Sequence, residues 1–397
     1  MKKYYAATAI MCILALLASS FIFGFWNRTP EDMTLKVGFV YAEDESTPYT
    51  RNFVQAEHLL EEEYGSKVEI LSKSNVLSKS SEDPMRDLIR QGCRVLFTNL
   101  DTDITTKLAA EYPEVAFCQA SMPTISMEGQ PENYHTFNGE IYQARYAAGI
   151  VAGMKLRELL DSSAILPEDA QVGYVAANNT AEVVSGYTAF LLGIRSIAPE
   201  ARMRVRYTGT WSSYSLEKQR ARELIDEGCV IISQHTNTMA PANACEEALQ
   251  AGKRVYYVGY HQSMMDVAPS TTLISLRTNW YPYISGTVNA LLNREEIEKS
   301  VPGHVHGRDM SAGFDEDWVQ MLELNVYLAA PGTEQKLEET IEGFRAGKID
   351  VFRGNYTGVS TTDPNDVIDL RQGYTEHRNS SSPSFHYVLR DYIIEEN

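Results

Sequence analysis

The sequence predicts an α/β fold made of two lobes, each built around a parallel sheet, with several chain crossings that form a hinge between the lobes. Three observations carry this prediction. Apolar runs without polar alternation, such as LKVGFVY at 35–41, are typical of strands that helices cover on both faces. Amphipathic helical segments separate these runs, as the crossovers of a parallel sheet require. One helix–turn–strand unit also occurs twice.

The repeated unit indicates two lobes of the same design. Each copy is an amphipathic helix, a Gly-Cys turn and an apolar strand: MRDLIRQGCRVLF at 85–97 and ARELIDEGCVIIS at 221–233. Each is followed by a polar tip, a helix and a further strand, at 115–118 and 255–258. Chance similarity is the alternative, because α/β proteins reuse this pattern widely. The matching order of parts favours duplication or a parallel architecture.

Apolar periodicity predicts the elements between these units. Apolar residues three and four positions apart predict a helix over 49–64 that Gly65 ends. Apolar runs predict strands of the second lobe at 172–176 and 202–207. Near the C-terminus, FHYVLRDYII at 385–394 fits either a strand or a helix.

We expect the chain to cross between the lobes more than once. Residues 273–275 are predicted to return it to the first lobe, and residues 328–352 to bring it back to the second. Two lobes joined in this way can close on a ligand. The predicted division is an N-terminal segment of 1–33, a first lobe of 34–138 plus about 273–327, and a second lobe of 139–272 plus about 328–397.

Composition excludes one large class of function. The chain has 397 residues, 44% of them hydrophobic, which is enough for at least one large core and favours two domains. Its formal net charge is -18, and no basic stripe follows Lys2 and Lys3. Binding to phosphate backbones needs clustered Lys and Arg, so we expect no nucleic-acid partner.

The N-terminus predicts export. Lys2 and Lys3 precede residues 4–26, a run without charge that is about long enough to cross the hydrocarbon layer. We favour a retained membrane helix, with the lysines in the cytoplasm and the rest of the chain outside. A cleaved signal peptide is the alternative, since residues 18–20 are small enough for a cleavage site.

Motifs of catalysis and metal binding are absent from the sequence. It contains no G-x-S-x-G, G-x-x-x-x-G-K-[ST], G-x-G-x-x-G or H-E-x-x-H pattern. No two cysteines have the C-x-x-C spacing of a zinc or redox site. His304 and His306 could share one side of an extended segment, but no third ligand is evident, so we interpret them as part of a solvated loop. We expect no enzyme activity, cofactor or metal.

Aromatic and amide residues gather instead at the predicted ends of strands. This composition suits a flat polar ring that is stacked and hydrogen-bonded. Open α/β sheets bind ligands at the carboxyl ends of their strands. The candidates are Tyr49, Asn52, Phe53, Asn99 and Asp101 in the first lobe, and Asn178, Trp211, Gln234 and Asn237 in the second.

Residues 133–155, NYHTFNGEIYQARYAAGIVAGMK, link the two predicted lobes. A strand leads into a helix that has small residues along one face, which favours close packing against another backbone. The run containing A-x-Y-x-x-G-x-x-A-G resembles the signature of the basic membrane protein family, the extracytoplasmic solute-binding components of ABC importers best known for purine nucleosides. This resemblance implies a type I periplasmic binding protein-like fold, with two Rossmann-like lobes on a multi-strand hinge. Family members are commonly lipoproteins, but the only cysteine near the apolar run, Cys12, lies too early for that modification.

The resemblance also selects site residues. One segment resembles a family motif in which a tryptophan and a glutamine match Trp211 and Gln234. This segment is GTWSSYSLEKQRARELIDEGCVIISQHTN. Further positions resemble family ligand loops, with His261 standing where a ribose-contacting aspartate is usual. These positions are Tyr49, Phe190, His261 and Trp280.

We therefore expect an extracytoplasmic solute-binding protein of an ABC importer. It would bind a small polar aromatic solute, nucleoside- or nucleobase-like, between its lobes, and its partners would be the ABC permease and ATPase subunits. One alternative is a membrane-anchored sensor or regulatory protein on the same fold. Another is an enzyme on this scaffold, such as a nucleoside hydrolase.

Overall fold

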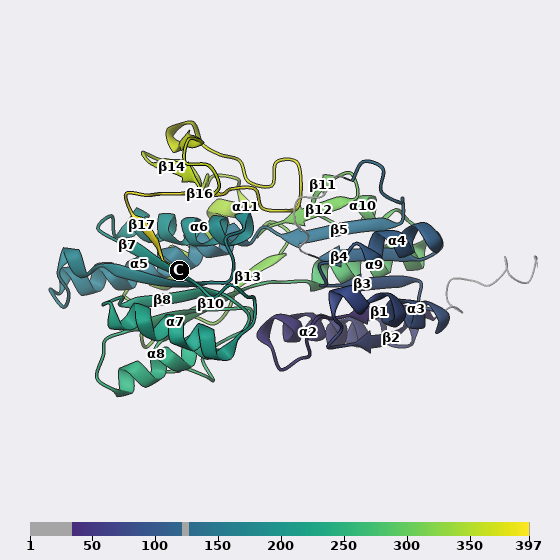
Figure 1. The fold of residues 1–397 in the computed structure, drawn as a ribbon, viewed down its shortest axis with the longest axis horizontal. Coiled ribbons are helices and arrows are strands. Elements are labelled where there is room, and N and C mark those ends of the chain that lie inside the picture. Colours follow the sequence, from purple (N-terminus) through teal and green to yellow (C-terminus); the bar gives the residue numbers. More distant parts are fainter. Residues whose placement is uncertain (1–33, 121–126, 397) are drawn as a thin grey trace, which may run out of the picture.

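The computed structural model describes residues 34–120 and 127–396 and contains two seven-stranded sheets in this part of the chain (Figure 1). Sheet 1 has the order β11-β12-β5-β4-β3-β1-β2, and its strands are parallel except for β11, which runs antiparallel to β12. Its strands are β1 (Leu35–Val40), β2 (Val68–Lys73), β3 (Val95–Thr98), β4 (Ala116–Ala120), β5 (Tyr134–Gly139), β11 (His304–His306) and β12 (Asp309–Ala312).

Sheet 2 has the order β13-β10-β9-β8-β6-β7-β17 and is parallel except for β13, which runs antiparallel to β10. Its strands are β6 (Gln171–Ala176), β7 (Arg202–Tyr207), β8 (Ile231–His235), β9 (Tyr256–Tyr260), β10 (Thr272–Thr278), β13 (Val319–Met321) and β17 (Ile393–Glu396). The predicted strands at 172–176 and 202–207 are therefore confirmed.

Both faces of sheet 1 are buried, as its apolar strands predict. Along β1 and β3, Phe39 and Phe97 enter one core, whereas their neighbours Val40 and Leu96 enter the other. This alternation places every second side chain on the same face. The covering helices are α2 (Pro48–Tyr64), α3 (Glu82–Arg90), α4 (Ile104–Glu111), α9 (Tyr281–Asn293) and α10 (Ile297–Ser300).

Sheet 2 is covered by α5 (Ile141–Asp161), α6 (Ala181–Ile197), α7 (Tyr214–Asp226), α8 (Ala240–Gln250) and α11 (Thr333–Arg345). The small residues of α5 face the backbone of α6, as predicted. A Cβ atom on Gly149 would lie 2.2 Å from the carbonyl oxygen of Phe190, and one on Gly193 would lie 2.2 Å from that of Tyr146. Glycine is required at both positions because the two backbones touch there.

The chain passes between the sheets along β5–α5, along β10–α9 and again between β12 and β13. The predicted return at 273–275 is wrong. These residues belong to β10, which pairs with β9 in sheet 2, and the chain leaves that sheet only after Thr278. A buried apolar strand and an inter-lobe connection have similar sequences, which explains the error. The predicted passage back at 328–352 is also wrong, because β13 already pairs with β10 in sheet 2.

The C-terminal segment forms strands rather than a helix. A small third sheet has the order β15-β14-β16, with β14 (Thr357–Ser360), β15 (Val367–Asp369) and β16 (Tyr387–Val388). The chain then ends in β17 at the edge of sheet 2. Short 3-10 turns are η2 (Gly65–Lys67), η3 (Ser78–Ser80), η4 (Pro167–Asp169) and η5 (Leu370–Gln372).

The predicted membrane segment lies outside the described residues. Among the helices of 34–120 and 127–396, none combines the length and the apolar character needed to span a bilayer.

Candidate ligand-binding site

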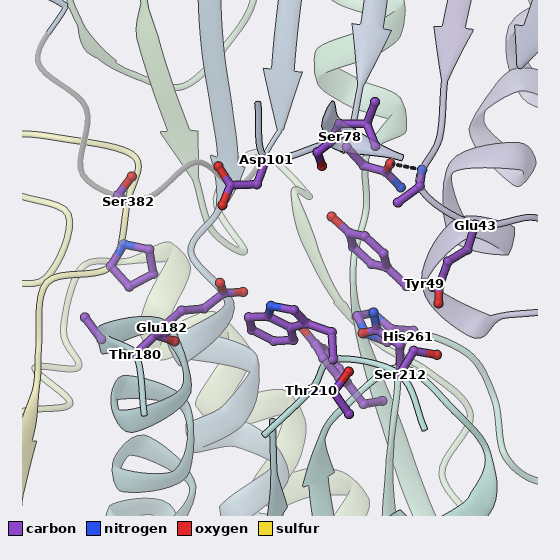
Figure 2. Close-up of a pocket in the computed structure, with 18 residues that line it drawn as sticks. Glu43, Tyr49, Ser78, Asp101, Thr180, Glu182, Thr210, Ser212, His261 and Ser382 are labelled. Carbon is purple, nitrogen blue, oxygen red and sulfur yellow. Dashed lines mark hydrogen bonds between the residues drawn. The ribbon is translucent and has the colours of Figure 1, made fainter. Parts of the chain in front are cut away.

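A cavity of about 680 Å³ lies between the two sheets, at the carboxyl ends of their strands (Figure 2). Open α/β sheets bind ligands at this edge because the loops after parallel strands converge there. Loops and helix starts from sheet 1 contribute Ala42, Glu43, Tyr49, Ser78, Asn99, Leu100 and Asp101. Those from sheet 2 contribute Thr180, Ala181, Glu182, Thr210, Trp211, Ser212, Asn237, Tyr260 and His261, and the C-terminal segment adds Ser382 and Pro383.

Aromatic rings line one part of the cavity. The side chain of Trp211 is 37% exposed, which leaves its ring available to a ligand. The ring of Tyr49 lies 5.1 Å from that of His261, centroid to centroid, and His261 stacks on Tyr260 at 3.5 Å. These rings come from both sheets, so a ligand held among them would contact both lobes.

Hydrogen bonds fix the loops that carry these rings. The backbone N–H of Asn237 donates to the carbonyl of Trp211 at 2.8 Å, which joins the loops after β7 and β8. The fully buried Glu217 carboxylate accepts from the N–H groups of Ser213 and Thr238 and from the Thr238 hydroxyl. Across the cavity, the Asn99 side chain accepts from the N–H of Ala42 at 3.0 Å (Figure 2). The rings are thereby positioned before any ligand enters.

The charged groups that line the cavity are acidic. Glu43, Asp101 and Glu182 present carboxylates, and none of the described lining residues is Lys or Arg. Burial raises the pKa of Glu182 to about 7. The site therefore offers acceptors to a ligand that carries N–H or O–H groups.

A buried arginine lies behind this surface. The guanidinium carbon of Arg145 is 3.9 Å from the centroid of the Tyr260 ring, and its Nη1 donates to the carbonyl of Gln234 at 2.8 Å. Burial and the charge of Arg145 hold the pKa values of His235 and His261 well below the usual range, so both imidazoles are neutral at pH 7. Neutral imidazoles can donate to or accept from a neutral polar ligand.

Six of the twelve residues predicted from sequence line the cavity. They come from five different connections in two sheets, and the structure brings them together around one space. They are Tyr49, Asn99, Asp101, Trp211, Asn237 and His261.

The other six lie outside its lining. Phe53 and Trp280 stack on each other at 4.5 Å within the core of the first lobe, so Trp280 is not a second platform in the cavity. Phe190 is fully buried in α6. Asn52 donates to the carbonyl of Thr278 at 2.5 Å and so ties α2 to the end of β10.

The two remaining residues shape loops. The amide nitrogen of Gln234 donates to the carbonyls of Thr236 at 2.9 Å and Thr238 at 2.7 Å, so this side chain supports the turn that carries Asn237. The carbonyl of Asn178 accepts from the N–H of Thr180 at 2.9 Å in the turn before α6. Residues in such loops are hard to separate from lining residues by sequence.

Sequence reasoning missed several lining residues. Glu182 stands in the first turn of the helix after β6, at the ligand edge, and that position was a usable signal. Glu43 lies in the first ligand loop, which was recognised without selecting this side chain. Ser382 and Pro383 had no signal, since nothing in a polar tail predicts where it returns in space.

The predicted loop at His304 and His306 is wrong, because both residues belong to β11. The ring of His304 contacts Glu140 at 2.7 Å and Asp315 at 3.2 Å, where the chain passes between the sheets. These two carboxylates raise the pKa of His304 to about 10. His304, Glu140 and Asp315 thus form an ion-pair cluster at this connection.

Comparison with known proteins agrees with this architecture. The chain is 28% identical over 325 residues to a purine-binding protein of Brucella abortus, covering 81% of this chain and 83% of that one. It is 32% identical over 184 residues to a putative ABC transporter glucose-binding protein of Haloferax volcanii, covering 46% and 42% of the two chains.

Solved structures share the fold at low sequence identity. An ABC transporter solute-binding protein of Aeropyrum pernix superimposes with a TM-score of 0.64 at 15% identity, covering 79% of this chain and 92% of that one. An ABC transporter solute-binding protein of Conexibacter woesei superimposes with a TM-score of 0.61 at 15% identity, covering 79% of this chain and 97% of that one. These likenesses confirm the type I periplasmic binding protein-like fold with two α/β lobes.

The family model described as ABC transporter substrate-binding protein PnrA-like matches residues 46–344, which include most of the residues that line the cavity. Such proteins work outside the cytoplasm, where they capture a small solute for an ABC transporter. The resemblance seen in the sequence is thus confirmed, and the chain belongs to the Bmp family of ABC transporter substrate-binding proteins.

Proposed function

We propose that this protein binds a purine base or purine nucleoside in the cavity between its two sheets and delivers it to an ABC permease. The observation that carries the proposal is the combination of stacking rings with acidic acceptors in one space of about 680 Å³. A cavity of this size is within the range that encloses a small organic ligand. The purine-binding relative from Brucella supports the same ligand class.

Stacking is the first part of the mechanism. A purine ring against Trp211, Tyr49 or His261 would gain about 0.5 to 1.5 kcal/mol per aromatic pair beyond the burial of its surface. Because Tyr49 belongs to the first lobe and Trp211 to the second, a ring held between them stabilises the closed arrangement of the lobes. Closure, rather than covalent chemistry, is the step that prepares the complex for the permease.

Selectivity comes from the polar lining. Exocyclic amino groups, ring N–H groups and ribose hydroxyls would donate to Asp101, Glu43 or Glu182. Leaving one such buried donor unpaired costs about 1 to 3 kcal/mol, so a ligand without these groups binds weakly. Asn99 and Asn237 supply amides that serve as donor and acceptor. His261 replaces the carboxylate that is usual in the family, which favours a base over a nucleoside at this point.

A sugar is the second candidate ligand. The Haloferax relative is described as a putative glucose-binding protein, and aromatic rings with carboxylates also suit the faces and hydroxyls of a monosaccharide. The Haloferax match covers less than half of either chain, whereas the Brucella match covers more than four fifths of both. This difference favours the purine.

We also propose that residues 4–26 retain the protein on the outer face of the membrane. Such an anchor would serve an importer component, and it would equally serve a sensor that signals to a membrane partner. Co-purification separates the two roles, because an importer component brings a permease and an ATPase with it.

Calorimetric titration of the full chain with adenine, guanine, adenosine, guanosine and glucose tests the proposed ligand. We expect micromolar or tighter binding of at least one purine and no heat with glucose. Binding of glucose alone, or of none of the five, would overturn the purine assignment. Free base released from a nucleoside during incubation would instead indicate a hydrolase.

A further inference from the structure

The C-terminal segment 354–396 reaches the ligand cavity, although it lies beyond the family match at 46–344. It leaves α11, forms the small sheet of β14, β15 and β16, and passes over the junction of the two lobes before it ends in β17 (Figure 1). On the way, Ser382 and Pro383 become part of the cavity lining.

One end of the segment is anchored to the second lobe. β17 pairs in parallel with β7, and the Glu396 carboxylate lies 2.9 Å from the guanidinium of Arg206. The ring of Phe385 stacks on Phe352 at 4.0 Å. Val388, Leu389 and Ile393 are buried in the core of this lobe.

The middle of the segment is bonded to the first lobe. Asp309 of β12 is 2% exposed, and its carboxylate accepts from the hydroxyl of Ser380 at 2.9 Å and from the N–H of Ser381 at 2.7 Å. The same carboxylate accepts from Thr136 in β5 at 2.8 Å. The segment is therefore held by both sheets, and opening the cleft strains or breaks its bonds to Asp309.

Within the cavity, Ser382 stands opposite Tyr49 and Glu43. Figure 2 shows it on the far side of the space, between Asp101 of the first lobe and Thr180 and Glu182 of the second. The segment thus covers the side of the cleft that the loops after β1 do not reach.

A buried histidine packs the segment against α5. His377 is 5% exposed, its ring stacks on Tyr142 at 5.7 Å, and neither ring nitrogen has a hydrogen-bond partner within the described residues. Tyr142 belongs to α5, so His377 packs the segment against the helix that begins where the chain passes between the sheets.

From these contacts we infer that residues 376–385 form a third wall of the ligand site, beside the walls that the two lobes provide. This wall limits the size of the ligand. It also slows the release of the ligand, because it is bonded to both lobes. This inference rests on the proposed solute binding. It assigns Ser382 and Pro383 to ligand contact and Asp309 to positioning the wall.

Two variants test the wall, with a control from the same segment. Oδ2 of Asp309 accepts from both Ser380 and Ser381, and Oδ1 accepts from Thr136. Asp309→Asn leaves only one acceptor oxygen for these two groups of bonds, and Pro383→Gly removes the ring from the lining. Asn379→Ala changes an exposed residue beside them. The dissociation rate of guanosine, or of whichever purine binds the wild type in calorimetry, is measured by stopped-flow tryptophan fluorescence. We expect at least a fivefold faster release in both variants and less than a twofold change in the control.

A second measurement does not need the ligand. Spin labels at Glu62→Cys in α2 and Gln250→Cys in α8 report the distance between the lobes. The four cysteines of the described part are buried, and Cys12→Ser removes the remaining thiol. We expect a broader and longer distance distribution in Asp309→Asn than in the wild type.

The outcomes separate the two proposals. If the wild type binds no purine, the ligand assignment fails while the spin-label distances still test the hold on the lobes. If the release rates stay within twofold of wild type and the distances are unchanged, the wall is refuted, even where the melting temperature falls. A lower melting temperature alone indicates a purely structural segment.

Discussion

The rings of Tyr49 and His261 lie 5.1 Å apart across the junction of the two lobes. Tyr49 is in the first turn of α2, after β1 of sheet 1, and His261 follows β9 of sheet 2. The backbone of His261 has φ near +69°, in the left-handed region that few residues other than glycine adopt. This conformation, together with the Tyr260 stack, aims the imidazole at the first lobe, so the carboxyl edges of both sheets share one site.

Replacing Trp211 by alanine should weaken ligand binding at least tenfold, because the variant loses a stacking surface in the cavity. A tenfold loss corresponds to about 1.4 kcal/mol, in the range of one aromatic contact. Tyr214→Ala is the matched control, since Tyr214 is the first residue of α7, three positions after Trp211, and lies outside the lining. Calorimetry on both variants checks this. Equal affinity in wild type and Trp211→Ala would remove the indole from the ligand site.

Trp280→Ala should act on folding rather than on ligand contact. Its side chain is 3% exposed and stacks on Phe53, and removing a buried Trp costs about 3 to 5 kcal/mol. Urea denaturation measures the change in the free energy of unfolding. Tyr49→Ala provides the comparison, with a larger loss of affinity and a smaller loss of stability. A stable Trp280→Ala protein that fails to bind would place Trp280 in the site after all.

Gly149→Ala should destabilise the second lobe by about 2 kcal/mol or more, because its methyl group would overlap the backbone of α6. Alanine normally favours a helix over glycine by about 1 kcal/mol, so the expected sign is opposite to helix propensity. Thermal unfolding of wild type and Gly149→Ala measures the change in melting temperature, which we expect to be negative. A raised melting temperature would mean that α5 and α6 are not in backbone contact.

Glu182→Gln should change how stability depends on pH. The pKa of Glu182 is raised from 4.5 to about 7, chiefly by burial, so the folded protein holds this proton more tightly than the unfolded chain does. The free energy of unfolding of the wild type therefore falls as pH rises from about 4.5 to 7, and this loss is absent in the variant. Relative to wild type, the variant should gain about 3 kcal/mol by pH 8.

Urea titrations of both proteins at pH 4.5, 6, 7 and 8 measure this difference. His235 lies 3.6 Å from Glu182 and is present in both proteins, so its own titration largely cancels in the comparison. Parallel curves for the two proteins across this range would show that Glu182 has an ordinary pKa.

The sequence predicted the sheets better than the site. A strand buried on both faces leaves an uninterrupted apolar run, as at Leu35–Val40, and the contact of α5 with α6 leaves a stripe of small residues. The crossing near residue 273 was misplaced because β10 is as apolar as a connection that passes through the core.

Aromatic residues near strand ends were the weak point of the site prediction. Trp211 and Trp280 both follow a strand and both resemble family positions, yet one is 37% exposed in the cavity and the other is 3% exposed in the core. The difference depends on whether a ring turns toward α2 or toward the opposite lobe, which no local pattern encodes. The position of Ser382 in the cavity depends on the hydrogen bonds that its neighbours Ser380 and Ser381 donate to Asp309. Asp309 is far away in the sequence, so no local pattern could predict this position either.

Calorimetric titration of the full chain with a panel of purine bases and nucleosides, with glucose alongside, tests the central claim most directly. The account predicts saturable binding of a purine at one site per chain, reduced at least tenfold in Trp211→Ala. Binding of glucose with no response to any purine, or purine binding that Trp211→Ala leaves unchanged, would contradict it.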